Sequence, residues 1–292
     1  MNNVFVYCEI DKTTIEEVSL ELLTKGRKLA NRLGVQLEAV AAGSGIKGKV
    51  EKEILSYGVD KLHVFDGEGL FPYTSKPHTD ILVNLFKQEQ PQICLMGATV
   101  IGRDLGPRVS SSLTSGLTAD CTDLEIGDFE DKKNNKTYKD LLYQIRPAFG
   151  GNIVATIVNP DHRPQMATVR SGVMKAEIVD PNYKGEIVYE EVDKFVPAED
   201  YVVKVIEREV QKAKNNLKGA PIVIRVLFRS RKASTCSAIW LTNFTAKSAP
   251  VAQPSTQVSA NTTCKSDKPA LRCVLKYTSL AVSPAPFSTW PV

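Results

Sequence analysis

The amino-acid composition changes sharply after about residue 226, and this change limits how much of the chain can belong to one fold. Residues 1–226 contain 29 Lys and Arg against 32 Asp and Glu, whereas residues 227–292 contain 8 Lys and Arg against one acid, Asp267. All 18 glycines lie at or before Gly219, while 24 of the last 66 residues are Ser, Thr or Pro. Because α/β domains use glycine at their turns, we predict a regular fold before residue 226 and a different kind of chain after it. The net charge of +4 comes from this last part, so it does not indicate nucleic-acid binding.

Short apolar runs alternate with helical patterns over residues 1 to about 125. The patterns predict strands at 4–8, 37–42, 62–65 and 93–96, and helices at 15–29, 50–56 and 79–87. Strands that are separated by helices pair in parallel through right-handed crossovers. The expected fold class is therefore α/β, with a doubly wound, mostly parallel sheet.

The remaining patterns predict a hairpin and the start of a second domain. Strands are expected at 141–145, 153–158, 186–192 and 221–224, and an amphipathic helix at 201–214 with Val202, Val205, Ile206 and Val210 facing inward. The strand at 221–224 would open a second α/β domain. We accordingly expect a first domain over 1–196, the start of the second over 197–226, and an anomalous tail over 227–292.

A glycine-rich turn after the second strand offers a candidate nucleotide site. Gly43, Gly45 and Gly48 satisfy the GxGxxG spacing, and Asp66 ends the next strand, where an acid could contact a ribose. The same glycines are also what a tight turn requires, and the fingerprint normally follows the first strand of such a fold. Nucleotide binding and a purely structural turn both remain open.

Three arginines are candidates for contacts with a partner. Arg103 and Arg108 lie in a glycine-rich segment, 97–109, that follows a buried strand and opens a helix, and Arg146 adjoins a proline at a strand end. Such arginines can also be paired locally or lie on an ordinary surface.

No metal site or catalytic residue is expected. The six cysteines form no CxxC pair, and His162 has no second histidine or cysteine nearby in the sequence. The motifs of serine hydrolases, P-loop proteins and zinc proteases do not occur. No apolar run reaches the length of about 18 residues that suggests a membrane span, and the amino terminus has no secretion pattern, so the expected compartment is the cytoplasm.

Two sequence blocks carry a family resemblance. GATVIGRDLGPRVSSSLTSGLTADCTDLEI at 97–126 and RPAFGGNIVATIVNPDHRPQMATVRSGVM at 146–174 closely resemble the amino-terminal domain of electron-transfer flavoprotein α subunits, and the likeness extends from Val4 to about Ile224. Ser171 stands where the family has a proline.

The resemblance implies a redox carrier rather than an enzyme with its own substrate. It implies an adenine-nucleotide-hydrolase-like first domain that packs on a β subunit, and a second domain that supplies most of an FAD site. It further implies electron transfer in a heterodimer, from flavin dehydrogenases of the acyl-CoA dehydrogenase type, as in fatty acid β-oxidation, to a quinone oxidoreductase or another acceptor. The first domain of the family carries no flavin of its own.

The family's FAD motifs are missing from residues 227–292 but can be recovered in another reading frame. Allowed codons for 248–256, 265–272 and 285–291, read one base earlier, encode VGASRAAVD, QVGQTGIA and GAIQHLA. We therefore predict a one-base frame change near 224–229, a disordered tail, and no α-subunit FAD on this chain as written. A natural disordered tail, a non-redox adenine-nucleotide-binding module and an inactive truncated product are the alternatives.

Overall fold

Seven parallel strands form the central sheet of the computed structural model. The structure describes residues 3–131, 135–148, 153–203, 205, 206 and 208, and the backbone of 223–224 and 247–248. The strands lie in the order β12 (Glu186–Glu190), β5 (Lys61–Asp66), β4 (Leu37–Gly43), β1 (Val4–Cys8), β6 (Ile93–Gly97), β11 (Gln165–Val169) and β7 (Leu117–Cys121). Every neighbouring pair in this sheet is parallel.

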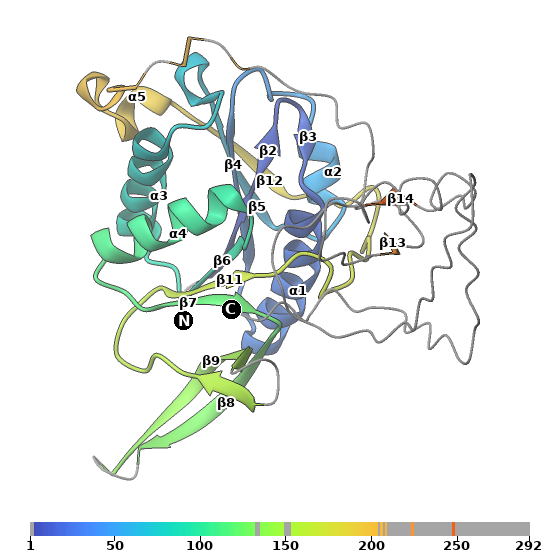
Figure 1. Ribbon diagram of the computed structural model, residues 1–292, viewed down its shortest axis with the longest axis vertical. Coiled ribbons are helices and arrows are strands. Elements are labelled where there is room, and N and C mark those ends of the chain that lie inside the picture. Colours follow the sequence, from blue (N-terminus) through green and yellow to red (C-terminus); the bar gives the residue numbers. More distant parts are fainter. Residues whose placement is uncertain are drawn as a thin grey trace, which may run out of the picture. The chain divides into compact units, whose positions relative to one another are not determined.

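Helices cover both faces of the sheet, and this explains the apolar strands. Figure 1 shows α1 (Glu17–Leu33) and α2 (Glu51–Leu55) on one side, and α3 (Ser75–Glu89) and α4 (Val100–Ser112) on the other. Successive side chains of β1 point to opposite faces, so Val4 and Val6 join the core under α1 while Phe5 and Tyr7 join the core under α3. The predicted doubly wound α/β class is confirmed.

The direction of winding reverses between β1 and β6. The chain passes from β1 through β4 to β5 on one side, and then crosses to β6 on the other side of β1. In doubly wound folds this point lies at the carboxyl ends of the strands, where ligands and partners commonly bind. The turns that follow β4 and β6 both lie at this edge.

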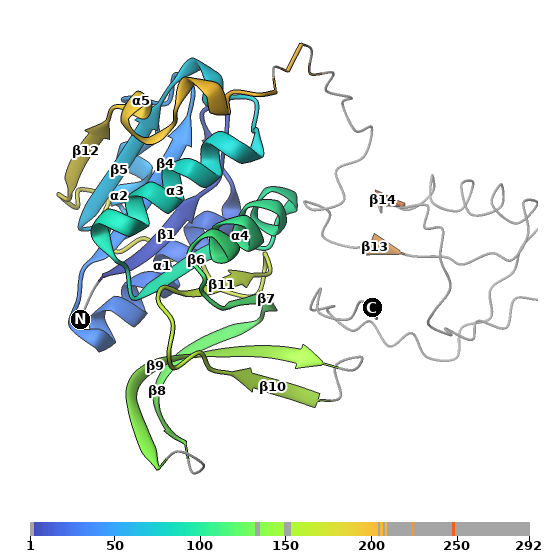
Figure 2. The same ribbon diagram turned by 90° about the vertical axis from the view of Figure 1, so that its left-hand side faces the viewer.

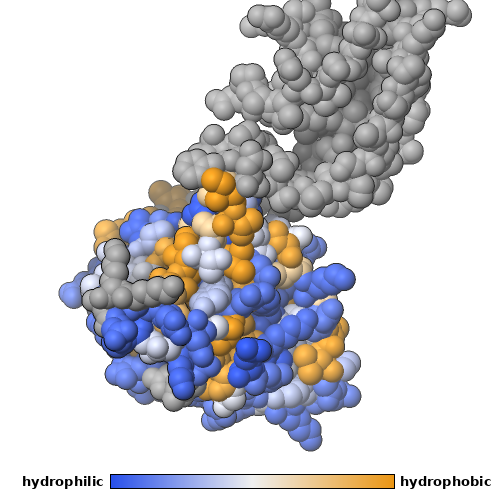
Figure 3. Space-filling model, turned by 90° about the horizontal axis from the view of Figure 1, so that it is seen from below, coloured by the Kyte–Doolittle hydropathy of each residue, from blue (hydrophilic) through white to orange (hydrophobic). Residues whose placement is uncertain are grey.

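A second sheet is antiparallel and has the order β10–β9–β8. It consists of β8 (Asp123–Asp131), β9 (Lys136–Ala148) and β10 (Ile153–Ile157), and it lies below the main sheet in Figures 1 and 2. The predicted pairing of the segments around 141–145 and 153–158 is confirmed. Seen from below, hydrophilic residues cover most of the described surface and hydrophobic residues form smaller patches between them (Figure 3).

The edge strand β12 is held by a buried polar contact as well as by backbone pairing. The Nε2 atom of His63 lies 2.9 Å from a carboxylate oxygen of Glu38, and its Nδ1 atom lies 3.1 Å from one of Glu190. His63 and Glu38 are both about 1% exposed. The imidazole therefore links β4, β5 and β12 across the sheet.

The helix predicted over 201–214 is wrong where the structure describes it. Residues 201–203, 205 and 206 have no helical conformation, and Val202 and Ile206 are 77% and 97% exposed instead of facing inward. An amphipathic helix of this length depends on an apolar surface against which it can pack, and neither side chain has one here. The rest of that segment, including Val210, lies outside the described residues.

The unit that contains the sheet extends to Ile206. Short elements complete it: β2 (Ile10–Asp11), β3 (Thr14–Ile15), a 3-10 turn at Glu68–Leu70, α5 (Val192–Phe195) and a 3-10 turn at Ala198–Asp200. In the other unit, the described residues are Arg208 and the parallel pair β13 (Val223–Ile224) and β14 (Lys247–Ser248). The predicted disorder and frame change of 227–292 otherwise lie outside the described residues.

Candidate functional site

Two glycine-rich turns lie at the carboxyl edge of the sheet. We call residues 43–48, which follow β4, the glycine loop, and residues 97–103, which follow β6, the α4 turn. Parallel strands end at the same edge of a sheet, so the predicted nucleotide candidates and the predicted partner arginine Arg103 belong to the same side of the domain.

The glycine loop is occupied by carboxylates of its own chain. The backbone N–H groups of Gly45 and Lys47 donate to the two oxygens of Asp66, with N···O distances of 2.6 and 3.1 Å. The N–H of Gly48 donates to Glu51 at 2.6 Å. Such convergent amides are the groups with which a glycine-rich turn would bind a phosphate. Asp66, which the sequence suggested as a ribose contact, instead accepts these hydrogen bonds.

The shape of the loop also requires its glycines. Gly45 and Gly48 adopt φ angles of 64° and 77°, a region that other residues rarely adopt. The Lys49 ammonium donates to the Gly45 carbonyl at 2.7 Å, and the Lys47 ammonium lies 4.3 Å from the centre of the Tyr189 ring on β12. The loop is thus tied to β5 through Asp66 and to β12 through Tyr189, which both lie on the same side of β4.

The α4 turn is built tightly around its glycines and presents an apolar side chain to solvent. The Thr99 hydroxyl caps α4 by accepting from the Gly102 N–H at 3.0 Å, and it donates to the Glu9 carboxylate after β1. A Cβ atom on Gly102 would lie 1.8 Å from the Gly97 carbonyl oxygen, so only glycine fits there. Val100, the first residue of α4, is 90% exposed.

Arg103 shares a carboxylate with a second arginine. Its guanidinium lies 2.9 Å from Asp120, near the end of β7, and its side chain is 58% exposed. Arg170, which follows β11, lies 4.0 Å from the other oxygen of Asp120. Asp120 adopts a φ of 60°, and its N–H donates to the Thr168 hydroxyl at 3.1 Å.

Arg146 lies beside the same strand end. The Arg170 N–H donates to the Cys121 carbonyl at 3.2 Å, and the Thr122 N–H donates to the Ile145 carbonyl at 2.8 Å. These contacts bring β11, β7 and β9 together where Arg146 follows Ile145. Burial raises the pKa of the Cys121 thiol to about 11, and the nearby charge of Arg146 opposes this rise.

The structure pairs the predicted candidate Arg108 differently. Its Nε atom donates to Asp104 at 2.9 Å, one turn earlier on α4. Asp104 also accepts from the Tyr73 hydroxyl at 2.9 Å, and burial together with this contact raises the pKa of Tyr73. Arg103 and Arg146 thus lie by the end of β7, whereas Arg108 belongs to a contact between α4 and the segment before α3.

Arg170 and Asp120 were not among the predicted interface residues. Their positions at the ends of two strands in a parallel sheet are the sequence feature that could have found them. However, they become neighbours only because β11, which comes late in the sequence, lies between β6 and β7. No local pattern in the sequence specifies that insertion.

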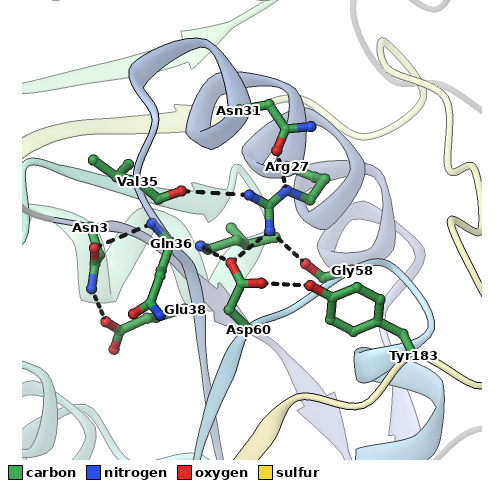
Figure 4. Close-up of polar contacts among 10 residues, drawn as sticks. Asn3, Arg27, Asn31, Val35, Gln36, Glu38, Gly58, Asp60 and Tyr183 are labelled. Carbon is green, nitrogen blue, oxygen red and sulfur yellow. Dashed lines mark hydrogen bonds and ion pairs between the residues drawn. The ribbon is translucent and has the colours of Figure 1, made fainter.

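The opposite edge of the sheet holds a shallow pocket of about 520 Å³. Figure 4 shows its polar centre, where Arg27 contacts Asp60 at 2.6 Å and the Tyr183 hydroxyl donates to Asp60 at 2.6 Å. Burial raises the pKa of Asp60, but the hydrogen bonds from Tyr183, the Leu37 N–H and Arg27 outweigh it and lower the pKa. These groups satisfy one another, which indicates a structural cluster.

The described residues offer no metal centre. They contain no group of three His, Cys, Asp or Glu side chains that could hold a metal ion. His162 is exposed. Cys8, Cys94 and Cys121 are buried free thiols, and burial raises the pKa of Cys8 to about 12. No helix of the described chain is long and apolar enough to span a membrane.

The fold and its arginine-lined edge define a doubly wound α/β domain with a candidate surface for partners. Residues 4–195 match the family model described as "Electron transfer flavoprotein domain". The chain belongs to this family, as its sequence blocks suggested.

Three relatives illustrate the breadth of the family. The chain is 44% identical over 203 residues to "Electron transfer flavoprotein subunit alpha" of Clostridium acetobutylicum, which covers 69% of this chain and 57% of the relative. It is 38% identical over 186 residues to "Acryloyl-CoA reductase electron transfer subunit beta" of Anaerotignum propionicum, covering 59% and 50%. It is 39% identical over 208 residues to "Lactate dehydrogenase (NAD(+),ferredoxin) subunit LctC" of Acetobacterium woodii, covering 70% and 47%. The matches span only about half of these relatives' lengths, between 47% and 57%.

Proposed function

We propose that this chain is the α-type subunit of an electron-transfer flavoprotein and works as a heterodimer with a β subunit. In this role it carries electrons from a flavin dehydrogenase to a quinone oxidoreductase or another acceptor, and it has no substrate of its own. The observation that carries the proposal is that the two characteristic sequence blocks, 97–126 and 146–174, meet at the end of β7. Arg103 and Arg146 lie there and are the proposed contacts with the β subunit.

The names of the relatives support electron transfer with more than one kind of dehydrogenase. One relative is named for acryloyl-CoA reductase and another for a lactate dehydrogenase. For this chain we propose a donor of the acyl-CoA dehydrogenase type, and we place the complex in the cytoplasm.

The proposed cofactor is FAD, which would supply the electron chemistry when bound. The described residues do not fit it at the glycine loop, because the amides that would face a pyrophosphate already donate to Asp66 and Glu51. We therefore propose that residues 1–196 bind the partner and that 197–226 begin the FAD domain. Residues 227–292 would be an out-of-frame tail, which leaves the chain as written without its FAD.

The test is to sequence the coding DNA from about codon 215 to the stop, and to express both versions of the chain with the β subunit. We expect one base gained or lost near codon 226, and a yellow heterodimer with FAD absorbance only after the frame is restored. A confirmed present frame would overturn the frame change. A restored chain that forms no complex with the β subunit would overturn the proposed function.

The alternative of a nucleotide-binding module can be tested on the full chain. Because the loop amides have acceptors already, we expect no heat of binding when AMP or ATP is titrated into the protein in a calorimeter. Saturable binding that is lost in Gly48→Ala would instead favour the nucleotide module. The third alternative, an inactive product, predicts no complex with the β subunit.

A further inference from the structure

Three arginines lie near the carboxyl end of β7. Arg103 and Arg170 face the two oxygens of Asp120, and Arg146 lies near the next residue, Cys121. Asp120 does not use up the hydrogen-bonding capacity of Arg103, since a guanidinium has five N–H donors. Among the described residues, the Arg103 guanidinium makes one hydrogen bond, from a terminal nitrogen to Asp120 at 2.9 Å.

Asp120 also limits how these arginines can move. Its two oxygens face Arg103 and Arg170 separately, at 2.9 and 4.0 Å. The Asp120 backbone is itself fixed by the Thr168 hydroxyl. A guanidinium that is already oriented loses less conformational freedom when a ligand binds. Asp120 is therefore a positioning residue for a second anion.

Exposed apolar side chains lie on elements that carry or pair with these arginines, and they indicate what kind of ligand carries that anion. Val100 is 90% exposed and lies three residues before Arg103 on the same helix. On β10, Val154 is 67% exposed and Ile153 is 53% exposed, and Ala155 of that strand pairs with Arg146. Arginine among exposed apolar groups is typical of a protein interface, whereas a free phosphate would gain nothing from the valines.

We propose that Arg103 and Arg170, oriented by Asp120, bind a carboxylate of an acidic segment of the partner subunit, with Val100 and Val154 covered by the same segment. Carboxylates match the planar guanidinium fork and form strong paired hydrogen bonds with it. The inference rests on the proposed function, because it takes the β subunit as the partner. It adds the ligand chemistry, the second arginine and the role of Asp120.

The test measures binding of the full chain to its β subunit, with charge reversals at the two edges of the sheet. Arg103→Glu should weaken binding about tenfold or more, because it places like charges together. Arg103→Lys should weaken it less, because it keeps the charge and loses the fork. Lys28→Glu is the matched control, since Lys28 is 62% exposed on α1 and pairs with Glu177 beside the opposite pocket.

The salt dependence and a second variant separate the outcomes. Raising the salt concentration should weaken binding of the wild type and of Lys28→Glu, but have less effect on Arg103→Glu. Asp120→Asn, which leaves both arginines in place, should weaken binding by a smaller factor than Arg103→Glu. Thermal melting confirms that each variant is folded. If the wild type binds and folded Arg103→Glu binds equally well, this inference is overturned alone; if the wild type does not bind, the proposed function fails.

Discussion

The two glycine-rich turns at the carboxyl edge resemble each other in sequence but differ in what surrounds them. In the glycine loop, Asp66 from the neighbouring strand accepts hydrogen bonds from the loop amides. In the α4 turn, Thr99 donates to Glu9, Arg103 contacts Asp120 of β7, and Val100 is 90% exposed. The first turn is closed by its own chain, whereas the second presents charged and apolar groups outward.

The difference teaches that glycine spacing specifies a turn and not a ligand. Both turns need glycine for steric reasons, positive φ in one and close approach to a carbonyl in the other. What each turn can bind depends on the acids that other strands place beside it. The motifs made one turn a nucleotide candidate and placed a partner arginine in the other, but they did not show where these acids lie.

The largest expected effect on stability comes from Gly102 in the α4 turn, which lies close to the Gly97 carbonyl oxygen. Gly102→Ala places a methyl group 1.8 Å from the Gly97 carbonyl oxygen, so the free energy of unfolding should fall by about 3 kcal/mol. Gly48→Ala is the control: it has free space but a φ of 77°, and it should cost about 1 kcal/mol. Urea denaturation followed by circular dichroism measures both. Equal losses would contradict the distinction between crowding and backbone strain.

The second prediction compares the two acids. Asp66→Asn replaces an acceptor of two amide N–H groups by a group with one oxygen, and should lower the free energy of unfolding by about 1–2 kcal/mol. Asp120→Asn affects an ion pair with Arg103, whose side chain is 58% exposed, and a 4.0 Å pair with Arg170, and should cost about 0.5 kcal/mol or less. The same denaturation experiment applies. If Asp120→Asn lowers the free energy of unfolding more than Asp66→Asn does, the α4 turn, and not the glycine loop, depends on its acid for stability.

The third prediction concerns His78 of α3 and how the stability of the domain depends on pH. His78 contacts the Leu70 carbonyl and the Tyr7 hydroxyl, each at 3.0 Å, and burial lowers its pKa below the usual 6.5. As the pH falls, the unfolded chain therefore takes up a proton at His78 before the folded chain does. The contribution of the neutral imidazole to the free energy of unfolding is full above about pH 6.5 and is lost as the pH falls through the lower folded-state pKa.

Between pH 7 and pH 5, the wild type should lose more stability than His78→Gln, which cannot titrate. His162→Gln, at an exposed position, is the control and should leave the pH dependence of the melting temperature unchanged. If His78→Gln and the wild type lose stability in parallel, the buried imidazole does not destabilise the domain in acid.

The smallest expected effect separates the two arginines of α4. Arg108 contacts Asp104, which also binds Tyr73 before α3, so it lies away from the proposed contact, and Arg108→Gln should change the affinity for the β subunit by about twofold or less. Arg103→Gln should weaken it by roughly fivefold. Titration of the full chain with the β subunit measures both. A larger loss with Arg108→Gln would move the proposed contact along α4, away from the end of β7.

Local patterns predicted five of the seven strands of the main sheet, but they did not predict β7 or β11. The apolar run Val4–Cys8 is β1 as expected, and the segment 97–109 opens α4. The helix expected from 201 onward was wrong over the residues that the structure describes, because its periodicity matched a helix while no surface lies against Val202 or Ile206. Periodicity reports which side chains could face a core, but it does not supply the core.

The candidate site was only partly predictable for a related reason. Arg103 and Arg146 could be identified as candidates because glycines and a proline lie beside them in the sequence, and those residue types shape the local backbone. Asp120 and Arg170 could not be joined to them, because β11 reaches its place between β6 and β7 after a long excursion through the second sheet. Likewise, the occupation of the glycine loop by Asp66 depends on two strands lying side by side.

By itself, the sequence determined the α/β class, the family of residues 4–195 and the positions of the turns, because these follow from short-range periodicity, steric preference and motif identity. The tertiary structure decided which turn has its amides bound by acids of the chain, and which arginines share a carboxylate. Those properties depend on contacts between strands far apart in the sequence, and strand order is fixed by packing of the whole sheet.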